Sequence, residues 1–127
     1  MQTKKVSGVM THRVIEAIGP DESVLQAATK MKEVKKGCLL VTEGAEPVGI
    51  VTQTDLINKV LAEGLSPAAL SVSEVMTKEL VTIDSESSVY DAVERMIEKR
   101  VRRLVVTEGD LAVGIVTTTD LAGLLVK

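Results

Sequence analysis

The strings VGIVTQTDL at 48–56 and VGIVTTTDL at 113–121 differ at a single position, where Gln53 is matched by Thr118. Two further pairs of strings repeat at almost the same spacing: VSGVMT at 6–11 with VSEVMT at 72–77, and LLVTEG at 39–44 with LVVTEG at 104–109. Because the matches run from one end of the chain to the other, the chain is a tandem repeat of a unit of about sixty residues.

The repeat sets the expected domain boundaries. We expect one domain at 6–64 and a second at 72–127. The stretch between them, 65–71, follows Gly64 and contains Pro67, which is typical of a linker.

Each copy has the same pattern of predicted elements. In the first copy we expect an extended segment, a helix, two strands and a second helix, at 14–18, 22–36, 39–42, 48–52 and 55–63. The second copy repeats this order from an extended segment at 80–83 to a helix at 120–126. Asp21 and Ser85 are the predicted N-caps of the two longer helices. The predicted fold is therefore α+β, with the order β-α-β-β-α present twice.

The composition limits both the core and the function. The chain of 127 residues has one Tyr, no Trp and no Phe, so its core is aliphatic and base stacking on aromatic side chains is nearly excluded. Tyr90, on the first helix of the second copy, is expected to be partly buried. A net charge of −3 argues against a general nucleic-acid or anionic-membrane binder. A single cysteine, Cys38, and the absence of a signal or spanning segment favour the cytoplasm.

A unit of this size is marginally stable alone, so the two copies are expected to pack together. The strands are apolar on both faces, which indicates burial on both sides and packing of sheet against sheet about a pseudo-twofold axis. Apolar helix residues that this packing leaves over favour a homodimer; they are Leu56, Ile57, Val60, Leu61, Leu121, Leu124 and Leu125.

The string from Gly49 to Asp55 allows two interpretations. A strand runs directly into a helix, so Thr52 and Asp55 have the spacing of a capping box, which needs no ligand. The same Thr and Asp side chains could bind phosphate and the hydroxyls of a ribose, with Gly49 allowing close approach of the backbone. Duplication at 113–121 does not separate the two interpretations, because a structural motif also duplicates.

Together the strings VMT, LLVTEG and VGIVTxTDL, in this order and twice, resemble the cystathionine-β-synthase (CBS) domain and its tandem pair, the Bateman module. The resemblance covers almost all of 6–126. It implies a pseudo-twofold pair with two clefts that bind adenosyl compounds such as AMP, ADP, ATP or S-adenosylmethionine. It also implies that any protein this module regulates is a separate chain, and nothing in the sequence identifies such a partner.

The resemblance also implies roles for individual residues. Asp55 and Asp120 would hold ribose hydroxyls, with threonine hydroxyls near the ribose or phosphate, and aliphatic side chains and backbone would contact the adenine. The implied threonines are Thr52, Thr54, Thr117 and Thr119, and the implied isoleucines are Ile18, Ile50, Ile83 and Ile115.

The two copies differ just before the first strand of the hairpin. The second copy has Arg102 and Arg103 where the first has Gly37 and Cys38. By the resemblance, these arginines would serve phosphates in the cleft that holds Asp55, since a guanidinium group matches phosphate geometry. The alternative is a solvated charged stretch paired with nearby glutamates.

Two functions remain open. One is a sensor that binds an adenosine-containing ligand, and the other is a ligand-free module for dimerisation or docking. An enzyme is poorly supported, because the sequence offers no nucleophile–base pair, no metal-binding cluster and no glycine-rich phosphate loop.

Overall fold

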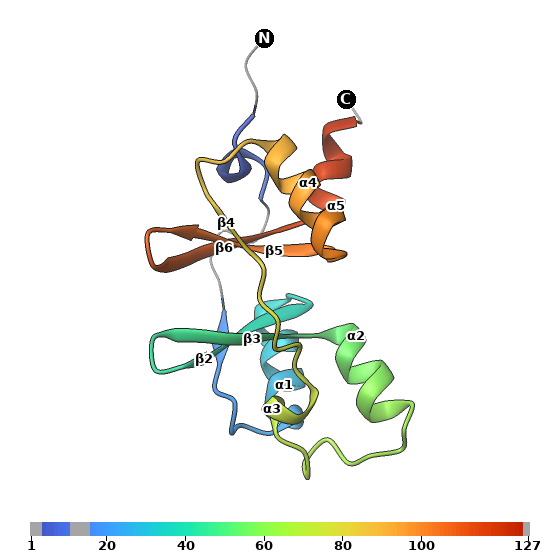
Figure 1. Ribbon diagram of the computed structural model, residues 1–127. Coiled ribbons are helices and arrows are strands. Elements are labelled where there is room, and N and C mark those ends of the chain that lie inside the picture. Colours follow the sequence, from blue (N-terminus) through green and yellow to red (C-terminus); the bar gives the residue numbers. More distant parts are fainter. Residues whose placement is uncertain (1–3, 11–15, 126–127) are drawn as a thin grey trace. The chain divides into compact units, whose positions relative to one another are not determined.

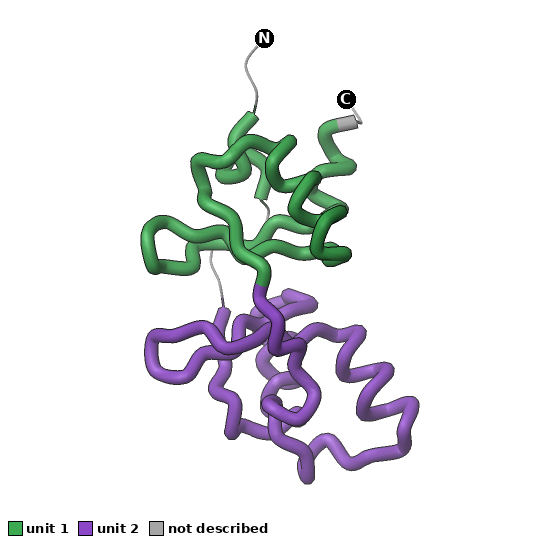
Figure 2. Tube along the Cα trace, in the orientation of Figure 1, with its two compact units in different colours: residues 1–15, 81–127 green, residues 16–80 purple. Residues whose placement is uncertain are grey.

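The computed structural model describes residues 4–10 and 16–125 (Figure 1). The chain forms two compact units (Figure 2). Unit 2 consists of Glu16–Leu80, and unit 1 consists of Met1–Ile15 together with Val81–Lys127. Each unit contains one three-stranded sheet and short helices, which confirms the predicted α+β class.

Unit 2 contains the first β-α-β-β-α series. Its elements are β1 (Ala17–Ile18), α1 (Val24–Val34), β2 (Cys38–Glu43), β3 (Glu46–Thr52), α2 (Gln53–Leu56), a π-helical turn (Ile57–Leu61) and α3 (Val72–Val75). The sheet order is β1-β2-β3, with β1 parallel and β3 antiparallel to β2. Gly44 has φ 64° at the first of the two turn residues between β2 and β3, a backbone conformation that favours glycine in tight hairpins.

Unit 1 repeats this architecture. Its elements are a 3-10 turn (Val6–Gly8), β4 (Thr82–Asp84), α4 (Val89–Lys99), β5 (Arg103–Glu108), β6 (Leu111–Thr117), α5 (Thr118–Ala122) and a final 3-10 turn (Gly123–Leu125). Its sheet order is β4-β5-β6 with the same strand directions. Even the register shift repeats, between Val41 and Thr42 in β2 and between Val106 and Thr107 in β5.

The predicted N-caps are wrong by two or three residues. Ser23 caps α1, where its Oγ accepts a hydrogen bond of 3.0 Å from the Gln26 N–H, and Ser88 caps α4 by the same kind of bond to Asp91. Asp21 instead lies in an exposed turn, and Ser85 is buried ahead of the cap. Helix α1 is therefore shorter than the predicted 22–36.

The other predicted bounds also change. Helix α2 begins at Gln53, two residues before the predicted start, because Thr52 ends the strand and caps the helix in the same place. Of the predicted extended segment at 14–18, only Ala17 and Ile18 form a strand, and residues 14 and 15 lie outside the described residues. Val126, predicted to be helical, also lies outside them.

The segment that begins each repeat folds with the other repeat. In unit 1, the Val6 N–H donates to the Ser87 carbonyl at 2.9 Å. In unit 2, the Val72 N–H donates to the Glu22 carbonyl at 2.8 Å, which holds α3 against the start of α1. The boundaries of the sequence repeat therefore differ from those of the compact units. Helix α3 is an element that the sequence pattern does not predict.

Each unit has its own core of aliphatic side chains, as the composition predicts. The core of unit 2 contains Val24, Met31, Leu39 and Val51 among others, and the core of unit 1 contains Met96, Leu104 and Val116, the counterparts of the last three. Leu39 and Leu40 are both buried although successive strand residues point to opposite faces, so burial on both faces of the strand is confirmed.

Two expectations about exposure are wrong. Tyr90 is 71% exposed, because α4 turns its Ala92 and Met96 side toward the core and leaves Tyr90 outside. Leu56 and Val60 are buried in the core of unit 2 and are not available to a second chain, whereas Ile57 is exposed. The Leu125 side chain lies outside the described residues.

Candidate functional site

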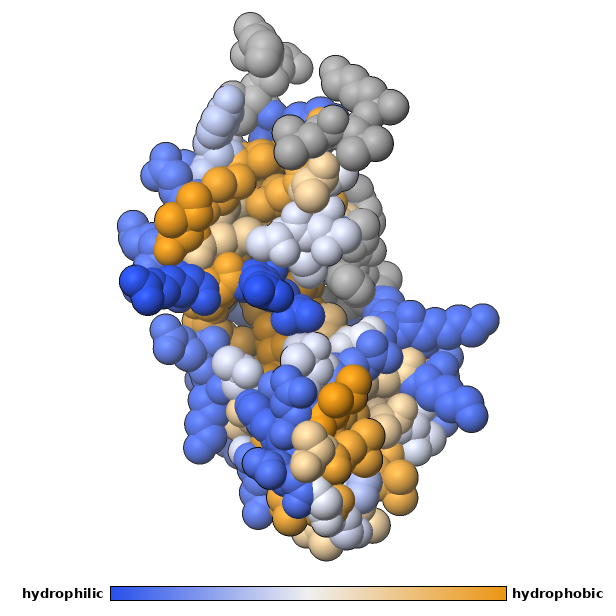
Figure 3. Space-filling model, turned by 90° about the vertical axis from the view of Figure 1, so that its right-hand side faces the viewer, coloured by the Kyte–Doolittle hydropathy of each residue, from blue (hydrophilic) through white to orange (hydrophobic). Residues whose placement is uncertain are grey.

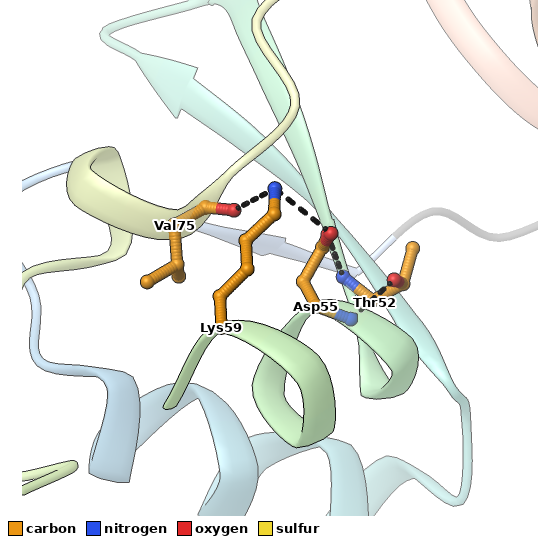
Figure 4. Close-up of polar contacts among 4 residues, drawn as sticks. All are labelled: Thr52, Asp55, Lys59 and Val75. Atoms are coloured by element: carbon orange, nitrogen blue, oxygen red, sulfur yellow. Dashed lines mark hydrogen bonds and ion pairs between the residues drawn. The ribbon is translucent and has the colours of Figure 1, made fainter. Parts of the chain in front are cut away.

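The junction of β3 and α2 positions the first pair of predicted site residues. The Thr52 N–H donates to Asp55 Oδ2 at 2.9 Å, and the Asp55 N–H donates to Thr52 Oγ1 at 3.1 Å (Figure 4). Both side chains are buried, while Thr54 is exposed between them. This is a complete capping box, so the capping interpretation is confirmed at this junction.

Lys59 holds the other oxygen of the Asp55 carboxylate. Its Nζ lies 3.1 Å from Asp55 Oδ1 and donates to the Val75 carbonyl at 2.8 Å (Figure 4). Lys59 is not among the site residues predicted from the sequence. Its spacing of four residues from Asp55 on one helix is a signal that could have found it, because such pairs face each other.

The second junction, between β6 and α5, has the same geometry. The Thr117 N–H donates to Asp120 Oδ2 at 2.8 Å, and the Asp120 N–H donates to Thr117 Oγ1 at 3.2 Å. Thr119 is exposed, like Thr54 in the first copy. The matched position of Lys59 holds Leu124, so the two junctions differ in charge one helical turn after the aspartate.

The basic pair lies beside the second junction within unit 1. Arg103 is the strand partner of Thr117, and the Arg102 carbonyl accepts a hydrogen bond of 3.0 Å from the Thr118 N–H. In unit 2 the same places are taken by Cys38, the partner of Thr52, and by Gly37. Each junction therefore has the backbone of the preceding loop next to its helix start, with a basic pair in one copy and a neutral pair in the other.

All four predicted isoleucines are buried. Ile18 and Ile83 belong to the cores of their units. Ile50 and Ile115 lie beside core residues Val51 and Val116 on their strands and point to the opposite face of each sheet.

Another segment of the chain, and not a ligand, approaches the backbone of Gly49 closely in this structure. A Cβ atom at this position would lie 2.7 Å from Met76 Sδ and 2.9 Å from the Thr77 carbonyl. The neighbouring Ile50 exchanges two backbone hydrogen bonds with Thr77, at 3.0 and 2.8 Å. The missing side chain thus lets the segment that follows α3 pair with β3.

Other kinds of site are not found in the described part of the chain. No group of three or more His, Cys, Asp or Glu side chains there could hold a metal ion. Within the same residues, no helix has both the length and the apolar character needed to cross a membrane.

Two β-α-β-β-α units, each with a Thr–Asp capping box where its last strand meets a helix, define a tandem CBS-domain architecture. The CBS domain model matches residues 6–62 and 72–127, and the chain belongs to the CBS-domain family. Pairs of such domains are generally regulatory or signal-transduction modules.

Relatives support this assignment. The chain is 33% identical over 116 residues to the uncharacterized protein MK0525 of Methanopyrus kandleri, covering 90% of this chain and 59% of that protein. It is 33% identical over 117 residues to the CBS domain-containing protein YhcV of Bacillus subtilis, covering 92% and 82%. The match therefore spans less than two thirds of the Methanopyrus protein.

Solved structures share the fold. An uncharacterized conserved protein from Pyrococcus horikoshii superposes with a TM-score of 0.84 at 28% identity, covering 100% of this chain and 96% of that one. A hexameric CBS-CP12 protein from bloom-forming cyanobacteria gives a TM-score of 0.86 at 30% identity, covering 96% and 68%. Oligomeric assembly thus occurs among the structural neighbours.

Proposed function

We propose that this chain is a regulatory module that binds an adenosine-containing ligand, of the AMP, ADP, ATP or S-adenosylmethionine type, and thereby modulates its own assembly or a separate partner. One observation carries the proposal: the Thr-x-Thr-Asp junction occurs twice at matched places in a pair of CBS domains, each time with an exposed threonine beside the capping aspartate. A cytoplasmic location is part of the proposal.

Capping does not exhaust the chemistry of the two aspartates. Each carboxylate oxygen has more than one lone pair, so an oxygen that accepts a backbone N–H can accept a second hydrogen bond. Vicinal hydroxyls of a ribose can donate to Asp55 or Asp120, and the hydroxyls of Thr54 and Thr119 can bond the sugar or a phosphate. Buried Ile50 and Ile115, next to the junctions, are the proposed aliphatic contacts of the adenine.

Thermal melting of the full chain tests the proposal. AMP, ATP, NAD and S-adenosylmethionine, each at millimolar concentration, are added to the wild-type chain and to the double variant Asp55→Ala, Asp120→Ala. At least one ligand is expected to raise the melting temperature of the wild type, since a ligand at about 100 times its Kd adds about 2.7 kcal/mol to the stability of the folded state. The double variant is expected to lose this shift.

Asp21→Ala, an exposed aspartate of unit 2, is the matched control and is expected to keep the wild-type shift. A wild-type chain that no ligand stabilises, or a double variant that keeps the full shift, would count against the proposal.

Phosphate recognition is assigned to Arg102 and Arg103, because a guanidinium group donates bidentate, charge-assisted hydrogen bonds to phosphate. The Arg103→Ala variant is expected to bind AMP about 10-fold more weakly, in line with the loss of one charged hydrogen bond, and to bind adenosine as the wild type does. Calorimetric titration measures both affinities, with exposed Lys99→Ala as the control for net charge. Equal AMP affinity in Arg103→Ala and the wild type would assign the arginines to a solvated surface.

A second candidate function, dimerisation or docking without a ligand, is favoured by apolar residues at the surface (Figure 3). On α4, Ile97 is 72% exposed, and a groove of about 410 Å³ between α4 and α5 is lined by Val93, Ile97, Leu121 and Leu124 among others. These residues form one continuous apolar face of unit 1.

The proposed homodimer uses this face. Sedimentation of the wild type is expected to give a particle of twice 13.5 kDa, and Ile97→Arg is expected to shift the equilibrium toward the monomer by placing a charge in the contact. The exposed Leu111→Arg variant, on β6, serves as the control. A wild-type chain that sediments as a monomer at high concentration contradicts the dimer.

A further inference from the structure

Lys59 has a defined place beside the Asp55 carboxylate. Its ammonium group is 3.1 Å from Asp55 Oδ1 and 2.8 Å from the Val75 carbonyl oxygen. The Asp55 side chain is 12% exposed and the Lys59 side chain 46% exposed, so solvent reaches the pair mainly on the lysine side. An ammonium group has three N–H donors, and these two contacts use two of them.

The pair combines a group that only accepts hydrogen bonds with a group that only donates them. An ionised carboxylate has no proton to donate, and an ammonium group has no lone pair to accept with. A hydroxyl group does both, so a single hydroxyl can donate to Asp55 and accept from Lys59. A deoxyribose has a hydrogen atom in place of that hydroxyl. When such a ligand binds, Asp55 and Lys59 lose hydrogen bonds with water and gain none with the ligand.

The matched position of the second repeat does not carry an ammonium group. Leu124 stands where the first repeat has Lys59, and its side chain can neither donate nor accept a hydrogen bond. The turns that carry the two residues also differ, since Lys59 lies in a π-helical turn and Leu124 in a 3-10 turn. Isolated π-helical turns are frequently found at functional sites.

We propose that Lys59 is a specificity-determining residue of the Asp55 site and that, with Asp55, it selects ligands with a ribose over those with a deoxyribose. The proposal rests on the proposed function, because it assumes that Asp55 meets the sugar of an adenosine ligand. It adds Lys59, a residue that the second repeat replaces by Leu124, and a selectivity for the sugar of the ligand.

Titration of the full chain in an Asp120→Asn background, which removes the carboxylate of the second site, tests the proposal. AMP, 2′-deoxy-AMP and 3′-deoxy-AMP are added to the chain with Lys59 and to the chain with Lys59→Met. With Lys59, we expect at least one deoxy compound to bind about 10- to 100-fold more weakly than AMP, the range for hydrogen bonds to charged groups. We call the Kd of that deoxy compound divided by the Kd of AMP the discrimination ratio. With Lys59→Met, we expect the discrimination ratio to fall to about a tenth of its former value.

Two further variants isolate the role of the side chain. Lys32→Met removes the same charge from an exposed position on α1 and is expected to leave the ratio unchanged. Lys59→Arg keeps a charged donor and is expected to keep most of the discrimination, which also tests the proposal should Lys59→Met fold poorly.

The outcomes separate the two claims. If Lys59→Met weakens AMP and both deoxy compounds by one common factor, Lys59 only supports the fold of the site, and the inference fails while the proposed function stands. If Lys32→Met lowers the ratio as much as Lys59→Met does, the effect belongs to net charge and the inference also fails. If the chain with Lys59 does not bind AMP, the inference fails, whereas the proposed function fails only if none of the adenosine ligands raises the melting temperature of the wild type.

Discussion

Replacing Leu39 by alanine is expected to lower the free energy of unfolding by about 3 kcal/mol, within the range of 2–5 kcal/mol for buried leucines. Leu39 is fully buried on β2, in the core that joins the sheet of unit 2 to α1. The variant loses the burial of the side chain and leaves a cavity that the rigid strand cannot close. Urea unfolding followed by circular dichroism measures the change.

The repeat supplies a matched variant for this prediction. Leu104→Ala removes the same side chain at the same place in β5, where Leu104 is equally buried, and a loss of similar size is expected. Leu25→Ala, at a position of α1 that is 50% exposed, is the control and is expected to cost less than about 1 kcal/mol. A loss below 1 kcal/mol in both buried variants would contradict the two-core architecture.

Gly49→Ala is expected to destabilise the chain by about 2–4 kcal/mol, the sum of overpacking and of two backbone hydrogen bonds. The new Cβ would lie 2.9 Å from the carbonyl oxygen of Thr77, which belongs to the backbone and cannot rotate away. The segment of Met76 and Thr77 must therefore leave β3, and its two hydrogen bonds with Ile50 are lost or weakened. Hydrogen exchange is expected to become faster at the amides of Ile50 and Thr77.

Gly123→Ala is the control for this prediction. A Cβ at Gly123 meets no atom within 4 Å, and its φ of −59° suits alanine, so the expected change in stability is within about 0.5 kcal/mol. Unchanged stability and unchanged exchange in Gly49→Ala would show that the segment after α3 does not pack against β3 in solution.

The strands and the order of elements could be predicted from the sequence because the signal is local. Apolar runs of β-branched residues mark β2, β3, β5 and β6, and Gly44 and Gly109 mark the turns. The N-caps of the helices could not be predicted to the residue, because Asp21 after Pro20 also has the features of a helix start. The structure instead caps α1 with Ser23, in a capping box with Gln26. On α4, Tyr90, Val93 and Ile97 form a second apolar stripe, and spacing alone does not say which stripe faces the core.

The candidate site could be predicted in part for the same reason. Thr52 and Asp55 are three residues apart, so their mutual contact follows from the helix start that contains them. The Lys59–Asp55 pair has a local signal as well, because the two residues are four apart on one helical segment. The contacts of Lys59 with Val75 and of Gly49 with Met76 join residues far apart in the chain. A local sequence pattern cannot predict such contacts, because they depend on how the segments of unit 2 pack against one another.

The exchange of starting segments has a consequence for how such a chain could arise. A polypeptide with a single repeat would hold one starting segment, and to pair it as this chain does, each copy would donate its starting segment to a second copy. Such reciprocal donation is domain swapping, a low-cost route to a two-chain assembly. Fusing two copies end to end makes the donation intramolecular, so folding no longer depends on protein concentration. The two halves are then free to diverge, as Lys59 and Leu124 have done.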